Sequence, residues 1–264
     1  MSFASIGGVT LHYRLTGSPD GPPLVLINSL GTDLRIWDEV VARLADRYRI
    51  LCYDKRGHGL SDAPAGPYGL DDHVADLAGL LAHCGARRAA VCGISIGGMV
   101  AMRLATRHPG KVDGLILCDT GPTIGTPQMW NDRIARVRDE GLPALADELA
   151  SRWVSPAYRE QQPAAFAGWR NMLERCSSEG YVASCATVRD ADLSAELPSI
   201  AAPTLVVVGA NDLTTPPEVA RRLADAIPHA RLKELRDTGH VPAIEQPAGL
   251  AELIREHLSE VVHV

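Results

Sequence analysis

Aromatic residues and long apolar runs are scarce in this sequence. Phe, Trp and Tyr make up 5% of its 264 residues, so we expect a mostly aliphatic core. The least polar stretch, residues 89–102, is shorter than the about 20 residues that a helix needs to cross a bilayer. The first residues also lack the basic start and apolar stretch of a signal peptide. These absences predict a cytoplasmic protein with no membrane partner.

An excess of basic charge is also missing. The 26 Lys and Arg residues are outnumbered by 32 Asp and Glu residues, which gives a formal net charge of −6. The chain therefore has no general attraction for nucleic acid. The six Cys residues show no spacing typical of a zinc site or a redox pair. We expect neither a nucleic-acid partner nor a metal, and the sequence specifies no oligomeric state.

Short apolar runs alternate along the chain with segments of helical periodicity. The strand-like runs are residues 24–27, 50–53, 88–93, 115–118 and 204–209. Residues 71–83 and 99–107 have the spacing of apolar positions that is typical of a helix. This alternation predicts an α/β fold, in which helices cover a mainly parallel sheet.

The alternation stops between residues 122 and 198. This segment has a helical pattern without strands, and it contains three of the four Trp residues. A segment of about 75 residues would form a poor core of its own. We therefore interpret residues 122–198 as a helical cap, inserted into one core domain that consists of residues 1–121 and 199–264.

A nucleophile motif follows the strand-like run 88–93. Residues 93–98 read Gly-Ile-Ser-Ile-Gly-Gly and match G-x-S-x-G directly before a helical segment. A strained turn between a strand and a helix exposes the Ser oxygen, and small residues make room for that turn. The pattern predicts Ser95 as a nucleophile. The alternative is an ordinary glycine-rich turn.

A serine nucleophile needs a base, and the base needs an acid that orients it. His240 lies in a loop after the strand-like residues 231–235, and we predict it as the base. His58 is the competitor, but it precedes the nucleophile in the chain, and we interpret it as a residue that braces a loop.

Asp212 is the predicted acid. It follows the buried run 204–209, at the edge where open α/β sheets bind their ligands. The order along the chain is then Ser95, Asp212, His240. Two alternatives stay open: Asp119 follows the run 115–118 and could be the acid, and Asp212 could instead cap a helix.

Acyl transfer also needs donors for the tetrahedral oxyanion. The backbone N–H of Ile96, next to the nucleophile, is the first predicted donor. The second is the N–H of Leu30, in the loop Asn-Ser-Leu-Gly-Thr that follows the strand-like run 24–27. The alternative for this loop is a plain turn.

Four motifs, in their order along the chain, resemble those of the α/β-hydrolase family. They are GISIGG (93–98), DKRGHGLSD (54–62), GANDLTTPP (209–217) and TGHVPAIEQP (238–247). The resemblance covers residues 9–258. It implies an eight-stranded, mostly parallel sheet flanked by helices, with a helical cap inserted after strand six.

A narrower resemblance is to the 3-oxoadipate enol-lactonases of aromatic catabolism. It depends on residues 28–38, 92–101 and 190–193. Asn28 and Ser29 stand where many relatives carry His-Gly, a departure that this subgroup shares. Small esterases, haloperoxidase-like hydrolases and carbon–carbon bond hydrolases have much of the same pattern. Relatives with an Asp nucleophile are disfavoured because position 95 is Ser.

This resemblance implies a carboxylic-ester hydrolase that opens a small lactone through an acyl-enzyme on Ser95, without a metal or organic cofactor. A carboxylesterase or another lactonase is the alternative within the fold. A ligand-binding protein without catalytic activity is the alternative from another class.

The implied substrate bears a carboxylate, so we expect a cation among apolar walls in the cap. The predicted set is Trp130, Arg133, Arg152 and Trp153. Trp130 and Arg133 are three residues apart and would share a helix face. The alternative is that these Trp residues only fill the core of the cap.

Overall fold

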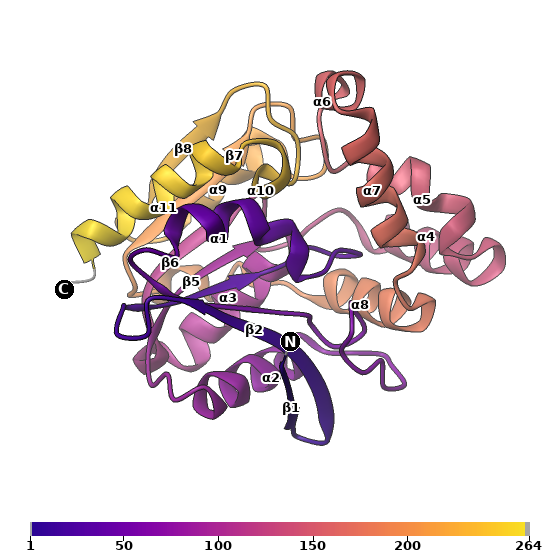
Figure 1. Cartoon of the computed structure of the whole chain (residues 1–264). Coiled ribbons are helices and arrows are strands. Elements are labelled where there is room, and N and C mark those ends of the chain that lie inside the picture. The colour runs from indigo at the N-terminus through magenta and orange to yellow at the C-terminus, as the bar shows by residue number, and fades with distance from the viewer. Residues whose placement is uncertain (1, 262–264) are drawn as a thin grey trace.

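The computed structural model describes residues 2–261. Within this range the chain forms one eight-stranded sheet with the order β1-β2-β4-β3-β5-β6-β7-β8 (Figure 1). The strands are β1 (Ser2–Ile6), β2 (Val9–Gly17), β3 (Pro23–Ile27), β4 (Arg49–Tyr53), β5 (Ala89–Ile94), β6 (Val112–Cys118), β7 (Thr204–Gly209) and β8 (Arg231–Leu235). Only the β1–β2 and β2–β4 pairs are antiparallel. The predicted mostly parallel sheet is confirmed.

The central strands are buried because helices cover both faces of the sheet. Every residue of β5 and β7 is buried, as their continuous apolar sequences predict. The edge strand β8, with the sequence Arg-Leu-Lys-Glu-Leu, keeps its charged side chains exposed. Such charges on an edge strand discourage pairing with another chain.

The helices of the core form two layers. They are α1 (Asp38–Leu44), α2 (Leu70–His83), α3 (Ile96–Arg107), α9 (Pro217–Ala226), α10 (Pro242–Glu245) and α11 (Pro247–Val261), with short 3-10 helices at Leu34–Trp37, Pro109–Lys111 and Leu197–Ser199. Helices α1 and α11 pack together on one face of the sheet, and α2 and α3 pack together on the other (Figure 1).

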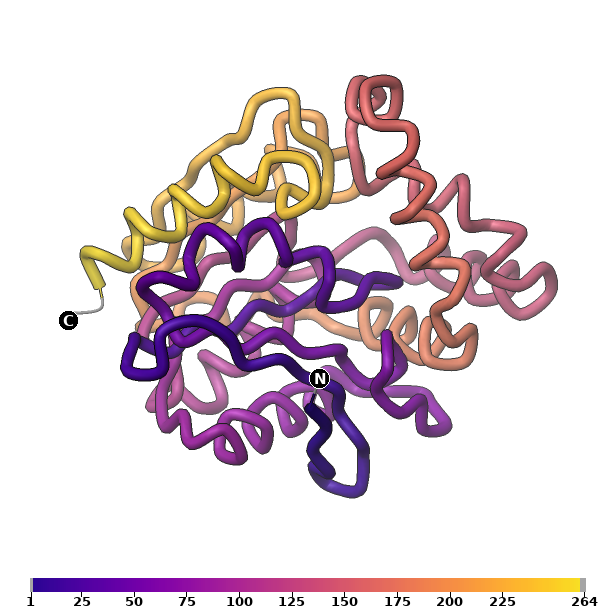
Figure 2. The backbone as a smooth tube through the Cα atoms, in the orientation of Figure 1, coloured from indigo at the N-terminus to yellow at the C-terminus, as the bar shows by residue number. Residues whose placement is uncertain are grey.

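Five helices lie between β6 and β7, where the sequence pattern changes. They are α4 (Pro127–Glu140), α5 (Leu142–Ala150), α6 (Pro156–Gln161), α7 (Pro163–Glu174) and α8 (Ser178–Asp190). We call residues 127–190 the helical insertion. Figure 2 shows the chain leaving the sheet, running through these helices and returning to it. The division of the chain into a core and a cap at residues 122 and 198 stays a prediction.

The parallel pairing brings the carboxyl ends of the strands to one edge of the sheet. Ile27 pairs with Tyr53 of β4 and with Gly93 of β5, and Cys118 pairs with Val207 of β7. The loops that follow these strands therefore meet at one place. Among residues 2–261, no helix is long and apolar enough to cross a bilayer.

Candidate active site

Ser95 lies in a strained turn between β5 and α3. Its φ of 57° and ψ of −120° are unusual for a residue other than Gly. Two hydrogen bonds hold it there: its N–H donates to the Cys118 carbonyl at 3.0 Å, and the Thr120 hydroxyl donates to its carbonyl at 2.7 Å. A Cβ on Gly93 would approach the Gly97 carbonyl oxygen to 2.2 Å. The turn therefore requires Gly at this position of the motif.

Asp212 and His240 form a buried acid–base pair. His240 Nδ1 donates to Asp212 Oδ2 at 2.8 Å, which leaves Nε2 of the ring as the basic atom. Burial raises the pKa of Asp212, but the His240 ring and hydrogen bonds from Thr215 and Thr214 outweigh it and hold that pKa well below its usual value. Helix α9 begins at Pro217 with Pro216 as its cap, so Asp212 does not cap it.

Ser95 and His240 line the same small cavity, between the sheet edge and the helical insertion. Its volume is about 30 Å³, and its wall is formed by Ser29, Leu30, Ser95, Trp130, Arg133, Leu149, Arg152, Trp153, Tyr181, Thr214 and His240. Across the part of the chain that the structure describes, no hydrogen bond joins the Ser95 hydroxyl to His240. Such bonds are often long before substrate binds.

The two predicted oxyanion donors, the N–H groups of Ile96 and Leu30, have no acceptor among residues 2–261. Ile96 is the first residue of α3, where N–H groups have no acceptor within the helix. Leu30 lies in the loop after β3 and contributes to the cavity wall. Within residues 2–261, neither N–H donates a backbone hydrogen bond. Both donors are therefore available to a bound oxygen.

His58 contacts the loop that carries Leu30, as its interpretation as a bracing residue predicts. Its Nε2 accepts a hydrogen bond from the Gly31 N–H at 3.0 Å. This nitrogen is therefore occupied, and His58 does not contribute to the wall that holds Ser95.

Asp119 lies beside the acid–base pair. One of its oxygens accepts the Gly209 N–H at 2.8 Å, and the other has no partner in the described residues. Burial, and then the charge of Asp212, raise the pKa of Asp119 well above its ordinary value. The His240 ring bonds to Asp212, so the structure favours Asp212 as the acid.

One group among residues 2–261 has ligand atoms close enough to one another to hold a metal ion. It consists of Asp119, Asp212 and His240, whose ligand atoms lie within 4.8 Å of one another. Both oxygens of Asp212 already accept hydrogen bonds, from Thr214, Thr215 and His240. These surroundings suit an acid–base pair better than a metal centre.

Trp130 and Arg133 lie on one face of α4 and stack on each other. The Arg133 guanidinium is 4.7 Å from the centre of the Trp130 ring, and the Trp130 indole N–H donates to the Ile124 carbonyl at 2.6 Å. Arg133 is half-buried at the cavity. The indole bond fixes the ring that in turn holds this guanidinium in place.

Arg152 and Trp153 also line the cavity, but they differ in exposure. Arg152 is exposed and lies 4.0 Å from Glu148, whereas Trp153 is buried. The Trp153 carbonyl accepts the Val241 N–H at 2.8 Å, which joins the insertion to the residue after His240. Arg133 is therefore the better placed of the two predicted cations.

Sequence reasoning missed four residues of the cavity wall: Ser29 and Thr214 in the loops after β3 and β7, and two side chains of the insertion, Tyr181 of α8 and Leu149 of α5. Tyr181 and Leu149 lie on helices of the insertion, and the cavity depends on how those helices pack. Helical periodicity indicates a buried face but not what that face contacts. No signal in the sequence could have separated these two residues from ordinary core residues.

Comparison with known proteins defines the class. Residues 22–247 match the family described as alpha/beta hydrolase fold, and the chain belongs to this family. Its relatives include the 3-oxoadipate enol-lactonase 2 of Acinetobacter baylyi, which is 37% identical over 90% of this chain and 89% of that protein.

Solved structures agree with this placement. The enol-lactonase from Burkholderia xenovorans superposes with a TM-score of 0.95 and 39% identity, covering 98% of this chain and 100% of that chain. A thermophilic esterase from Thermogutta terrifontis, solved with malate bound, gives a TM-score of 0.94 at 31% identity and covers 100% of both chains. The fold and the hydrolase class are thus common to all of these proteins.

Proposed function

We propose that this protein is a serine hydrolase that opens 3-oxoadipate enol-lactone to 3-oxoadipate through an acyl-enzyme on Ser95. The observation that carries the proposal is the convergence of the strained Ser95 turn and the Asp212–His240 pair on one cavity wall. The likeness to enol-lactonases from two organisms supports the choice of substrate.

The proposed reaction divides into two acyl-transfer steps. His240 Nε2 takes the proton of the Ser95 hydroxyl, whose oxygen attacks the lactone carbonyl. The N–H groups of Leu30 and Ile96 bind the oxyanion that forms, and a donor of this kind contributes about 10²–10³ in rate. The ring opens by loss of an enolate oxygen, which His240 protonates. Water then attacks the acyl-enzyme with the same residues acting in reverse.

Arg133 is the proposed partner of the substrate carboxylate. Its guanidinium is half-buried at the cavity and stacked on Trp130, among apolar side chains. A charge-assisted hydrogen bond in such a place is stronger than one at an exposed site. Arg152 is exposed and near Glu148, so we assign it a lesser part.

The proposal also includes a cytoplasmic location. All six Cys residues are free thiols, and four of them are buried: Cys52, Cys92 and Cys118 in β4, β5 and β6, and Cys185 in α8. Free thiols persist in a reducing compartment. A location outside such a compartment would expose Cys84 and Cys176, which are only partly buried, to oxidation.

Replacement of Ser95 by Ala tests the proposal. We expect turnover of the enol-lactone to fall by about 10⁴–10⁶, because residues of a triad act as a unit. The measurement is kcat of the purified variant, with its circular dichroism spectrum as the control for folding. Hydrolysis near the wild-type rate by a folded variant would refute Ser95 as the nucleophile. Binding of the enol-lactone by the wild-type protein without any turnover would instead favour a ligand-binding protein.

A further inference from the structure

A fully buried lysine lies behind the loop that carries Leu30. Lys55 follows β4, its side chain is 0% exposed, and its Nζ donates to the carbonyl oxygens of Asn28 at 2.8 Å and Ser29 at 3.0 Å. Lysine is rarely buried unless it is paired, because removal of its charge from water is costly. The two carbonyl groups that repay this cost belong to the proposed oxyanion loop, residues 28–32.

The carbonyl of Ser29 and the N–H of Leu30 belong to the same peptide group. In a planar trans peptide these two bonds point in opposite directions. Ser29 O accepts its two shortest hydrogen bonds from Lys55 Nζ and the Thr32 hydroxyl, both at 3.0 Å, and two longer ones, at 3.4 Å, from the Thr32 N–H and the Asn28 side-chain amide. The Leu30 N–H must then point away from Lys55. A half-turn of this peptide would instead present a carbonyl oxygen to the oxyanion and repel it.

The next peptide of the loop, between Leu30 and Gly31, is held by His58, which belongs to the same segment as Lys55. His58 Nε2 accepts the Gly31 N–H, and His58 Nδ1 donates to the Arg56 carbonyl at 3.1 Å. A backbone N–H can only donate, so Nε2 carries no proton and the ring is neutral. Gly31 has a φ of 76°, and a Cβ there would lie 2.6 Å from Leu173. This position of the loop therefore favours Gly, because a side chain would clash with the insertion.

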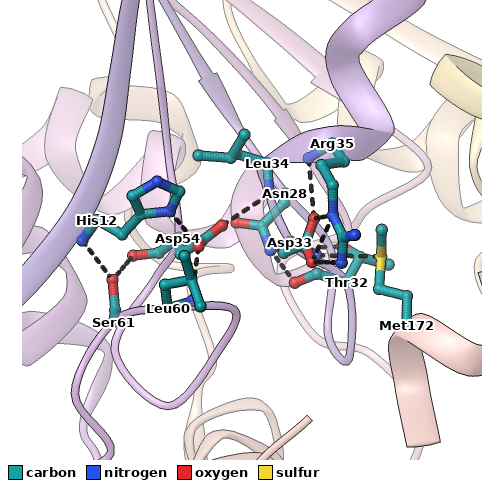
Figure 3. Close-up of polar contacts among 10 residues, drawn as sticks. All are labelled: His12, Asn28, Thr32, Asp33, Leu34, Arg35, Asp54, Leu60, Ser61 and Met172. Carbon is teal, nitrogen blue, oxygen red and sulfur yellow. Dashed lines mark hydrogen bonds and ion pairs between the residues drawn. The ribbon is translucent and has the colours of Figure 1, made fainter. Parts of the chain in front are cut away.

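The end of the loop is anchored by the residue before Lys55. Figure 3 shows Asp54 between His12 and the loop: its carboxylate accepts hydrogen bonds from His12 Nδ1 at 2.7 Å and from the Leu34 N–H at 2.8 Å. The Asn28 side chain donates to the Thr32 carbonyl, which closes the loop on itself. Residues 54–58 thus hold the loop along its whole length.

We propose that Lys55 is a positioning residue for hydrolysis, which holds the Ser29–Leu30 peptide with its N–H toward the oxyanion. The inference rests on the proposed function. It assigns a role to a lysine that takes no part in the reaction itself. A positively charged donor on the carbonyl also polarises the peptide, which strengthens its N–H as a donor in the same direction.

The charge on Lys55 depends on its surroundings. Burial has the largest effect on the pKa of Lys55 and lowers it to about 7. The nearby Cys176, Asp54 and Asp33 raise this pKa but do not outweigh burial. Two buried rings, His58 and His73, also face Lys55, and its charge lowers their pKa values further. Its ammonium therefore loses its proton as the pH rises through about 7, and the polarisation of the peptide is lost with it.

The Lys55→Met variant tests this role, with the exposed Lys233→Met as a matched control. We expect kcat for p-nitrophenyl acetate to fall about tenfold to a hundredfold, less than the loss of a direct oxyanion donor, with KM changed less than threefold. Phenylboronic acid, which forms a tetrahedral adduct with an active-site serine, should bind more weakly by the same factor as kcat. If Lys55 had only a structural role, its replacement would not reduce kcat and the affinity for phenylboronic acid by the same factor.

Unchanged kcat and boronate affinity in folded Lys55→Met would overturn the inference. If that variant does not fold, Lys55→Gln decides in the same way, because its polar but shorter side chain tolerates burial without reaching the two carbonyls. Ser95→Ala distinguishes the two claims. An active Ser95→Ala protein refutes the proposed function, whereas an inactive one beside a fully active Lys55→Met protein refutes only the role of Lys55.

Discussion

Asp119 and Asp212 are two neighbouring buried carboxyl groups whose surroundings move their pKa values in opposite directions. Asp212 accepts hydrogen bonds from His240, Thr214 and Thr215 and stays ionised. Asp119 accepts one backbone N–H, is buried, and lies near the charge of Asp212, so its pKa is raised. Protonation of Asp119 removes the repulsion between the two carboxylates.

Asp119→Asn should therefore stabilise the protein at neutral pH. A pKa raised in the folded state means that Asp119 favours folding below its unfolded pKa of about 4 and that this contribution is lost as the pH rises toward the folded pKa. Asn keeps the same shape without a charge, and it tolerates the φ of 45° at this position. Urea unfolding from pH 4 to 8 should show an advantage for the variant that grows with pH.

The exposed Asp139→Asn serves as the control, since its environment is close to that of the unfolded chain. A stability difference for Asp119→Asn that stays constant across the pH range would contradict the raised pKa. A difference that shrinks as the pH rises would mean that the charge on Asp119 stabilises the fold.

The secondary structure elements were largely predictable because each carries its own pattern. The continuous apolar runs of β5 and β7 are typical of strands that are buried on both faces of a sheet. The predicted run 88–93 begins one residue before β5, since Arg88 points to Asp113 at the surface instead of joining the strand. Lys55 and Tyr181 were not predictable, because their roles depend on contacts between segments far apart in the sequence.

The sequence of helix α4 predicts part of the candidate site but not all of it. The spacing of Trp130 and Arg133 predicts a common face, and the structure shows their stacking on that face. The sequence could not say that this face meets Ser95, because that depends on how the whole insertion packs on the sheet. Arg136 lies on the same helix but is exposed and ion-paired with Glu140 at 3.0 Å.

Arg133→Ala should weaken the reaction of an anionic lactone more than that of a neutral ester. Loss of a charge-assisted hydrogen bond costs about 1.5–3 kcal/mol, or roughly a tenfold to hundredfold rise in KM. The neutral ester of similar size should lose less than threefold, because it retains the apolar walls. The measurement is KM for both substrates, with Arg136→Ala as the control. Equal losses on the two substrates would exclude Arg133 as the carboxylate partner.

At the scale of the whole molecule, the insertion and the catalytic loop are joined by one carboxylate. Glu245 of α10 accepts the Ser155 N–H at 3.0 Å and the Gly239 N–H at 2.9 Å. The first belongs to the insertion and the second directly precedes His240. A movement of the insertion near Ser155 would therefore change the position of the loop that carries His240.

The small volume of the cavity leads us to expect that the insertion moves during turnover. The space beside Ser95 is about 30 Å³, whereas pockets for small ligands have volumes of about 300–1,000 Å³. A six-carbon lactone does not fit unless α4, α5 or α8 shifts outward.

The most direct test of the account is the ratio of kcat/KM values of the wild-type protein for a panel of substrates. The panel contains 3-oxoadipate enol-lactone, saturated lactones of similar size and p-nitrophenyl esters. We expect the highest value for the enol-lactone, since it combines an enolate leaving group with a carboxylate for Arg133. A protein that hydrolyses the esters but not the enol-lactone would contradict the proposed substrate and would be a carboxylesterase of the same fold.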